Sequence, residues 1–199
     1  MDQRFIAAIE HLSEYGWYSS NDFFEPELLE DLRSTLLSLR DSDAFEPAKI
    51  GKGSKKKRIP EVRGDWIRWL SEIGDFPATK AYLAQVDEFR LALNQNVFLG
   101  ASEYEAHFAI YPSNTFYKKH LDRHRDTPHR ILTTTLYLNK DYSPEQGGQL
   151  EIEDLKQNKI ATVLPNWGTF VCFSSAEFPH QVLPTKVERY SLTGWMRSS

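Results

Sequence analysis

The stretch YEAHFAIYP at residues 104–112 opens a region of short segments rich in Tyr, Phe, Val, Ile and Thr, the residue types that β-strands favour. Turn signals separate these segments, such as Pro-Ser-Asn at 112–114 and Gly-Gly at 147–148. About eight short strands at this spacing predict a jelly-roll, also called a double-stranded β-helix. The other segments are FYKKHLD (116–122), ILTTTLYLN (131–139), GQLEIED (148–154), IATVLP (160–165), GTFVCFSS (168–175), HQVLPT (180–185) and RYSLTGWMR (189–197).

Residues 1–100 instead carry apolar side chains at helical spacing, and Pro26 suits the first turn of the second helix. A third helix, rich in Ala and Leu, is expected from about Pro77 to Asn94. The expected class is α+β. One domain spans residues 1–199, with a mostly helical part at 1–100 supporting a double-stranded β-helix core at 101–199. The apolar positions of the first two helices are Phe5, Ile6, Ile9 and Leu12, then Leu28, Leu29, Leu32, Leu36 and Leu37.

Composition narrows the function classes. A net charge of -4 argues against a general nucleic-acid binder or a protein of anionic membrane surfaces. No apolar run approaches the ~20 residues of a membrane helix. Asp2, Glu10 and Glu14 interrupt the N-terminal segment, unlike a signal peptide. The single cysteine, Cys172, is expected to be a small buried hydrophobe, and its lack of a disulfide partner favours the cytoplasm. The oligomeric state is left open.

The segment KIGKGSKKKR at 49–58 contains two glycines, one serine and six basic residues. It is expected to be an exposed, mobile loop. Two interpretations stay open. The loop is either a solvated linker, or a lid that contacts an acidic partner.

A metal site is suggested by His120 and Asp122, which lie two residues apart on one predicted strand and therefore face the same side. His180, on a later strand, supplies a third ligand. Two histidines and one carboxylate leave three coordination positions open, which suits non-haem Fe(II). The pair alone is more typical of a surface ion pair than of a metal site. Arg189, nine residues after His180 on the next strand, adds a guanidinium that can grip a carboxylate with two hydrogen bonds.

Longer segments resemble the Fe(II)- and 2-oxoglutarate-dependent oxygenases, within them the prolyl 4-hydroxylase-like branch. The similarity is closest to the hypoxia-sensing prolyl hydroxylases and their bacterial relatives, and it extends upstream to EVRGDWIRW at 61–69. The segments of the C-terminal half that carry it are AIYPSNTFYKKHLD (109–122), ILTTTLYLNKDY (131–142), GGQLEI (147–152), GTFVCFSSAEFPHQVLP (168–184) and ERYSLTGW (188–195).

The resemblance implies a role for individual residues. His120, Asp122 and His180 match the iron ligands, and Arg189 matches the arginine that binds the distal carboxylate of 2-oxoglutarate. It further implies an ion pair between Asp65 and Arg130. The remaining 2-oxoglutarate contacts are Tyr137, Tyr111, Leu150 and Thr193, and the positions that shape the substrate entrance are Trp69, Tyr117, Arg130 and Trp195.

For several of these residues a purely structural interpretation stays open. Tyr111, Tyr137 and Trp195 could be core aromatics, and Trp69 could pack a helix. Four histidines have no matching role and are expected to be surface or satisfied residues: His11, His107, His124 and His129.

The reaction that the resemblance implies is hydroxylation coupled to conversion of 2-oxoglutarate and O2 into succinate and CO2, with Fe(II) as the metal and ascorbate as a candidate reductant. The expected substrate is a prolyl residue of a protein, with elongation factor Tu as a candidate target. Nucleic acid and membrane are not expected partners. Three alternatives stay open: a hydroxylase of free amino acids or other small molecules, a nucleic-acid dealkylase, and a non-catalytic binding module.

Overall fold

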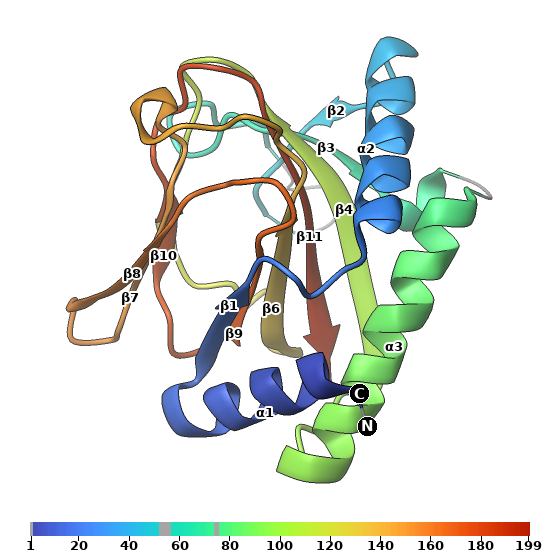
Figure 1. Cartoon of the computed structure of the whole chain (residues 1–199). Coiled ribbons are helices and arrows are strands. Elements are labelled where there is room, and N and C mark those ends of the chain that lie inside the picture. The colour runs from blue at the N-terminus through green and yellow to red at the C-terminus, as the bar shows by residue number, and fades with distance from the viewer. Residues whose placement is uncertain (1, 52–56, 74–75) are drawn as a thin grey trace.

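The structure is a computed structural model that describes residues 2–51, 57–73 and 76–199 (Figure 1). Three α-helices lie in its first half, and most strands lie in its second. The helices are α1 (Gln3–Tyr15), α2 (Pro26–Asp41) and α3 (Pro77–Val97), with 3-10 turns at Leu70–Glu72 and Pro144–Gln146. The strands are β1 (Trp17–Ser20), β2 (Glu46–Pro47), β3 (Trp66–Trp69), β4 (Glu103–Tyr111), β5 (Tyr117–His120), β6 (Arg130–Tyr137), β7 (Leu150–Glu153), β8 (Lys159–Val163), β9 (Phe170–Ser174), β10 (His180–Val182) and β11 (Arg189–Arg197).

Two antiparallel sheets form the jelly-roll, which confirms the expected fold class. The major sheet has the strand order β1-β9-β6-β11-β4-β3-β2, and the minor sheet has the order β5-β10-β7-β8. All eight strands expected from Tyr104 onward are present, within a few residues of their expected bounds. The space between the two sheets is where the polar side chains of the site gather.

Alternation along the strands of the major sheet separates two cores. On β4, Phe108 and Ile110 face the helices, whereas Ala109 and Tyr111 face the minor sheet. The helices cover the outer face of the major sheet (Figure 1). There the ring of Phe23 stacks on Phe170 with centroids 4.2 Å apart. The helices therefore bury the outer face of the major sheet, and its inner face borders the space between the two sheets.

The three expected helices are confirmed, and local chemistry explains their ends. Asp2 caps α1 by accepting a hydrogen bond from the backbone N–H of Arg4, and Gly16 ends the helix in the left-handed conformation, with φ 76°. Pro26 and Pro77 stand in the first turns of α2 and α3, where a missing N–H costs nothing.

The first half is less purely helical than expected, because it also contributes β1, β2 and β3 to the major sheet. Trp69 lies on β3, directly opposite His107 of β4, and its ring packs on His107 and Trp195, so its interpretation as a helix-packing residue is wrong. All four residues of β3 are half-buried, so this strand lacks the alternation that marks a strand in sequence.

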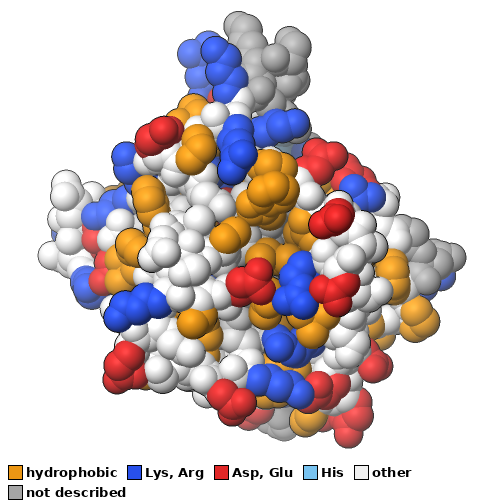
Figure 2. Space-filling model, turned by 90° about the horizontal axis from the view of Figure 1, so that it is seen from above, with side chains coloured by type: hydrophobic (Ala, Val, Ile, Leu, Met, Phe, Trp, Pro, Cys, Tyr) orange, Lys and Arg blue, Asp and Glu red, His pale blue; other side chains and the backbone are white. Residues whose placement is uncertain are grey.

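Residues 52–56 of the basic segment lie outside the described residues, so the lid stays a prediction. The two flanks of the segment pair with each other, since Ile50 and Lys57 exchange backbone hydrogen bonds of 2.8 and 2.9 Å. Over the described side chains of the face seen in Figure 2, basic and acidic groups are intermixed rather than gathered by sign. Among the helices of the described ranges, none has the length and apolar character needed to cross a bilayer.

Candidate active site

The three candidate metal ligands lie together at the end of the minor sheet. His120 ends β5, His180 begins β10, and the two residues are direct partners in the antiparallel ladder. Asp122 follows β5 by two residues. The possible ligand atoms of the three side chains all lie within 4.8 Å of one another. The Asp122 carboxylate is 3.5 Å from Nε2 of His120 and 3.4 Å from Nε2 of His180.

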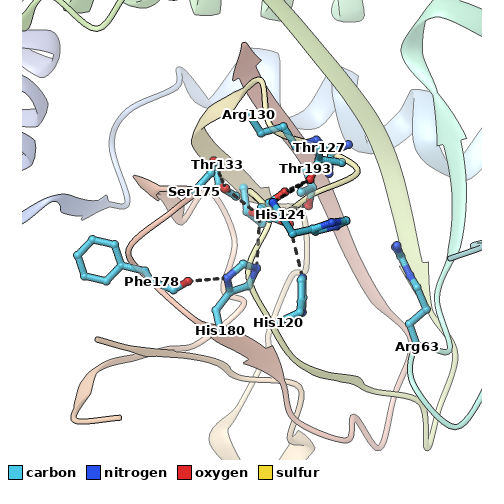
Figure 3. A network of polar contacts seen from close by, with 12 residues as sticks. Arg63, His120, His124, Thr127, Arg130, Thr133, Ser175, Phe178, His180 and Thr193 are labelled. Carbon is cyan, nitrogen blue, oxygen red and sulfur yellow. Dashed lines mark hydrogen bonds and ion pairs between the residues drawn. The ribbon is translucent and has the colours of Figure 1, made fainter. Parts of the chain in front are cut away.

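Backbone carbonyls orient both imidazoles. Nδ1 of His120 donates to the carbonyl of Lys118 at 2.8 Å. Nδ1 of His180 donates to the carbonyl of Phe178 at 3.0 Å (Figure 3). A carbonyl only accepts, so each ring carries its proton on Nδ1 and presents the lone pair of Nε2 to the centre. The ring of Tyr117 stacks on His120 at 3.8 Å and limits its rotation.

Burial sets the charge of this group. Burial lowers the pKa of His180 to about 4, so its imidazole is neutral at neutral pH. For Asp122 burial raises the pKa, but the adjoining imidazoles of His180 and His120 outweigh it and bring the pKa well below its usual value. One carboxylate with neutral imidazole is a ligand set that suits Fe(II).

A cavity of about 660 Å³ runs between the two sheets and passes the triad. At one end the guanidinium of Arg189 is buried. Its Nε donates to the carbonyl of Gly148 at 2.8 Å, and its carbon lies 4.8 Å from the rings of Tyr111 and Tyr137. The hydroxyl of Tyr137 is buried and has no hydrogen-bond partner among the described residues. A cation beside an unpartnered hydroxyl fits the carboxylate of a bound co-substrate.

The other residues expected at this end also line the cavity. Leu150 provides an apolar wall, and Thr193 lies on β11 next to Thr135, with their hydroxyls 3.3 Å apart. The structure therefore brings together the five side chains expected to contact 2-oxoglutarate: Arg189, Tyr137, Tyr111, Leu150 and Thr193.

The four residues expected at the substrate entrance also line the cavity: Trp69, Tyr117, Arg130 and Trp195. The guanidinium of Arg130 lies 3.4 Å from the centre of the Trp195 ring. This close stacking gives the cavity an aromatic and cationic wall at Arg130 and Trp195.

The expected ion pair between Asp65 and Arg130 is wrong. Asp65 binds Arg63 through two hydrogen bonds of 2.8 and 2.5 Å, while Arg130 binds Glu105 at 2.9 Å. Arg63 stands two residues before Asp65, within easy reach of its carboxylate. Arg63 itself lies 4.4 Å over the Tyr117 ring and also lines the cavity.

Sequence reasoning missed the place of His107. It is buried, lines the cavity, and packs edge-on against Trp69 at 5.0 Å and tilted against Trp195 at 5.4 Å. A signal was available, because His107 and Tyr111 are four residues apart on one strand and so share a face. The exposed His124 and His129 stand at the cavity lining, and Nδ1 of His11 contacts the carbonyl of Trp17.

Comparisons with known proteins agree with this geometry. Residues 106–197 match the model of the 2OG-Fe(II) oxygenase superfamily. Egl nine homolog 1 of Homo sapiens is 27% identical over 194 residues, which are 92% of this chain and 44% of that protein. The chain thus spans less than half the length of this relative.

Two solved structures extend the comparison to nearly the whole chain. A Pseudomonas putida prolyl-4-hydroxylase has a TM-score of 0.88 and 37% identity, over 98% of this chain and 99% of that one. A Trichoplax adhaerens prolyl hydroxylase, in complex with a peptide of the hypoxia-inducible factor, has a TM-score of 0.86 over 98% of this chain and 89% of that one, and its 23% identity supports the fold alone. Matching fold, sequence and metal-ligand pattern together show that the chain belongs to the 2OG-Fe(II) oxygenase superfamily, as a homologue of the prolyl hydroxylases.

Proposed function

We propose that the protein is an Fe(II)- and 2-oxoglutarate-dependent dioxygenase that hydroxylates a prolyl residue of a protein and forms succinate and CO2. One observation carries this proposal most directly. Along a single cavity, a triad of His120, Asp122 and His180 is followed by the buried guanidinium of Arg189 and the unpartnered hydroxyl of Tyr137. In this proposal residues 1–199 form a single oxygenase domain.

In this proposal the triad holds Fe(II), and Arg189 with Tyr137 binds the distal carboxylate of 2-oxoglutarate. Fe(II) with 2-oxoglutarate and O2 supplies the oxidising chemistry when all are bound. The protein's share is placement. Tyr111, Leu150 and Thr193 enclose the co-substrate between the sheets and exclude water from it.

The substrate end suits a prolyl ring in an extended peptide. Trp195 and Tyr117 contribute aromatic rings to this wall, and Arg130 and Arg63 are held over these rings by Glu105 and Asp65. Such a wall can pack a saturated ring and donate hydrogen bonds to peptide carbonyls. The Trichoplax relative was solved with a peptide bound, which supports a polypeptide substrate here.

The target we propose is an acidic segment of a protein, with elongation factor Tu as the first candidate. The support is the basic composition of residues 49–58, because opposite charges speed encounter between partners. The described part of this segment reaches the cavity, since Lys49, Ile50 and Gly51 line it. A lid made by this segment would set target choice more than the metal site does.

The test combines turnover with product identification. Purified protein is supplied with Fe(II), 2-oxoglutarate and O2, with and without ascorbate, and succinate is measured. Cell lysates and elongation factor Tu are then treated with the protein or with its Asp122→Ala variant, and proline residues that gain one oxygen atom are mapped by mass spectrometry. Oxygen gained only by free amino acids, or only by other residue types, would overturn the prolyl assignment.

A further inference from the structure

Two buried hydroxyls connect Asp122 to the major sheet. Thr133 lies on β6, and Ser175 directly follows β9, the neighbouring strand. Thr133 is 1% exposed and Ser175 is 0% exposed. The hydroxyl of Thr133 lies 2.8 Å from Oδ2 of Asp122 and 2.8 Å from the hydroxyl of Ser175 (Figure 3). Hydroxyls this deeply buried are tolerated because each finds a hydrogen-bond partner.

The direction of the hydrogen bonds in this chain is fixed by the number of protons. The carboxylate of Asp122 is ionised and can only accept, so Thr133 gives it its single proton. Thr133 then has only lone pairs left for Ser175, and Ser175 must donate. The chain therefore runs one way, from Ser175 to Thr133 to Asp122, and it ends in a charge-assisted hydrogen bond.

Further hydrogen bonds fix the backbone around Asp122. The hydroxyl of Thr127 donates to the carbonyl of Asp122 at 2.5 Å. The N–H of Arg123 donates to the carbonyl of Ser175 at 3.0 Å, and the N–H of Ser175 donates to the carbonyl of Ile131 at 3.1 Å. Asp122 is thus attached to β6 by its side chain, and the backbone of Arg123 attaches the same segment to the end of β9.

The placement of the two sheets gives this connection its meaning. His120 and His180 stand on β5 and β10 of the minor sheet, whereas Asp122 lies beyond the end of β5. The candidate co-substrate contacts Arg189 and Tyr137 stand on β11 and β6 of the major sheet. Thr133 and Tyr137 lie on the same face of one strand. The hydroxyl chain therefore attaches Asp122 to the major sheet, which also carries Arg189 and Tyr137.

We propose that Thr133, supported by Ser175, is a positioning residue that fixes the Asp122 carboxylate for metal binding. The proposal rests on the proposed function, since it assigns a role around the same metal site. Without the hydroxyl of Thr133, one carboxylate oxygen loses its donor, and Asp122 becomes free to turn away from the position between the two imidazoles. Mutation of a residue that hydrogen-bonds to a metal ligand typically weakens metal affinity by about 10- to 100-fold.

The experiment measures Mn(II) binding to the metal-free protein, by electron paramagnetic resonance of free Mn(II), and the visible spectrum of the Co(II)-loaded protein. Thr133→Val, which removes the hydroxyl, is expected to raise the Mn(II) dissociation constant at least about tenfold and to alter the Co(II) spectrum. Thr133→Ser, which keeps the hydroxyl, should restore both. Thr134→Val is the matched control, because Thr134 is equally buried on the same strand but bonds to Tyr104 and Gly194 instead.

The outcomes separate the two proposals. Failure of the unchanged protein to bind Mn(II) would overturn the proposed function. An unchanged dissociation constant in Thr133→Val, beside normal binding in the unchanged protein, would overturn the positioning role alone. Should Thr133→Val fail to fold, Ser175→Ala decides: a severalfold weaker Mn(II) affinity at an unaltered melting temperature supports the chain, and an unaltered affinity overturns it.

Discussion

The guanidinium carbon of Arg189 lies 4.8 Å from the ring of Tyr137, whose hydroxyl is buried and has no hydrogen-bond partner among the described residues. Both side chains are almost completely removed from solvent, Arg189 at 2% and Tyr137 at 0% exposure. Such a buried donor without an acceptor is costly, and a bound carboxylate would satisfy it together with the cation. The relationship therefore makes binding predictions that do not depend on the identity of the substrate.

Arg189→Ala should raise the dissociation constant of 2-oxoglutarate by more than about tenfold, since hydrogen bonds to charged groups contribute about 1.5–3 kcal/mol. Tyr137→Phe removes one neutral donor and should cost roughly fivefold, about 1 kcal/mol. Calorimetric titration of the Mn(II)-loaded protein measures both without turnover. Arg40→Ala is the control, because Arg40 bonds to Tyr190 and Glu188 outside the cavity. Equal affinity of Arg189→Ala and the unchanged protein would show that another group binds the co-substrate.

Asp122→Ala should abolish both metal binding and succinate formation, because it removes the only anionic group of the triad. The neutral imidazoles of His120 and His180 would remain. Equilibrium dialysis against Mn(II) and a succinate assay check the two consequences separately. Normal turnover in this variant would show that the reaction does not need the metal site formed by the triad.

The corrected ion pair gives a third prediction. Asp65→Asn should destabilise the fold by on the order of 3 kcal/mol, because it leaves the buried charge of Arg63 unpaired. A double-mutant cycle with Arg63→Gln should show strong coupling in the free energy of unfolding. The parallel cycle with Arg130→Gln should be additive within about 0.5 kcal/mol, since Arg130 binds Glu105. Strong coupling between Asp65 and Arg130 would contradict the geometry described above.

Part of the site could be predicted from local spacing, because two-residue alternation puts His120 and Asp122 on one strand face. His180 and Arg189 come from later strands, and the resemblance to the oxygenase family indicated their place in the site. The same alternation separates the two cores of β4 and β6. Residues whose neighbours follow from two-residue alternation along a strand can therefore be predicted from the sequence.

What could not be predicted depends on contacts between distant segments. Strand β1 pairs with β9 across most of the chain, and nothing in Trp17–Ser20 signals that partner. The partner of Asp65 depends on the reach of competing arginines. The role of Thr133 depends on where Ser175 and Asp122 meet in space, and a threonine in a strand is otherwise explained by β-propensity alone.

His107 gives the last prediction, on the pH dependence of stability. Burial, with a further contribution from Arg63, lowers its pKa from 6.5 to about 4. Its Nδ1 donates to the carbonyl of Phe108, which favours the protonated form, but burial outweighs this contact and keeps the ring neutral. Between pH 6.5 and 4 the unfolded chain binds the proton more readily than the folded one. As far as His107 is concerned, the free energy of unfolding is therefore highest above pH 6.5 and decreases as the pH falls towards 4.

His107→Gln keeps a hydrogen-bonding side chain at this position and removes its titration. From pH 7 to pH 5, we expect the unchanged protein to lose about 2 kcal/mol more unfolding free energy than the variant. Urea denaturation at the two pH values measures the difference, and the contribution of His180 is common to both proteins and cancels. His129→Gln, at an exposed site, controls for removal of a histidine as such. Equal pH dependence in the unchanged protein and His107→Gln would mean that the ring of His107 is protonated as readily in the fold as in the unfolded chain, and would contradict a neutral imidazole packed between Trp69 and Trp195.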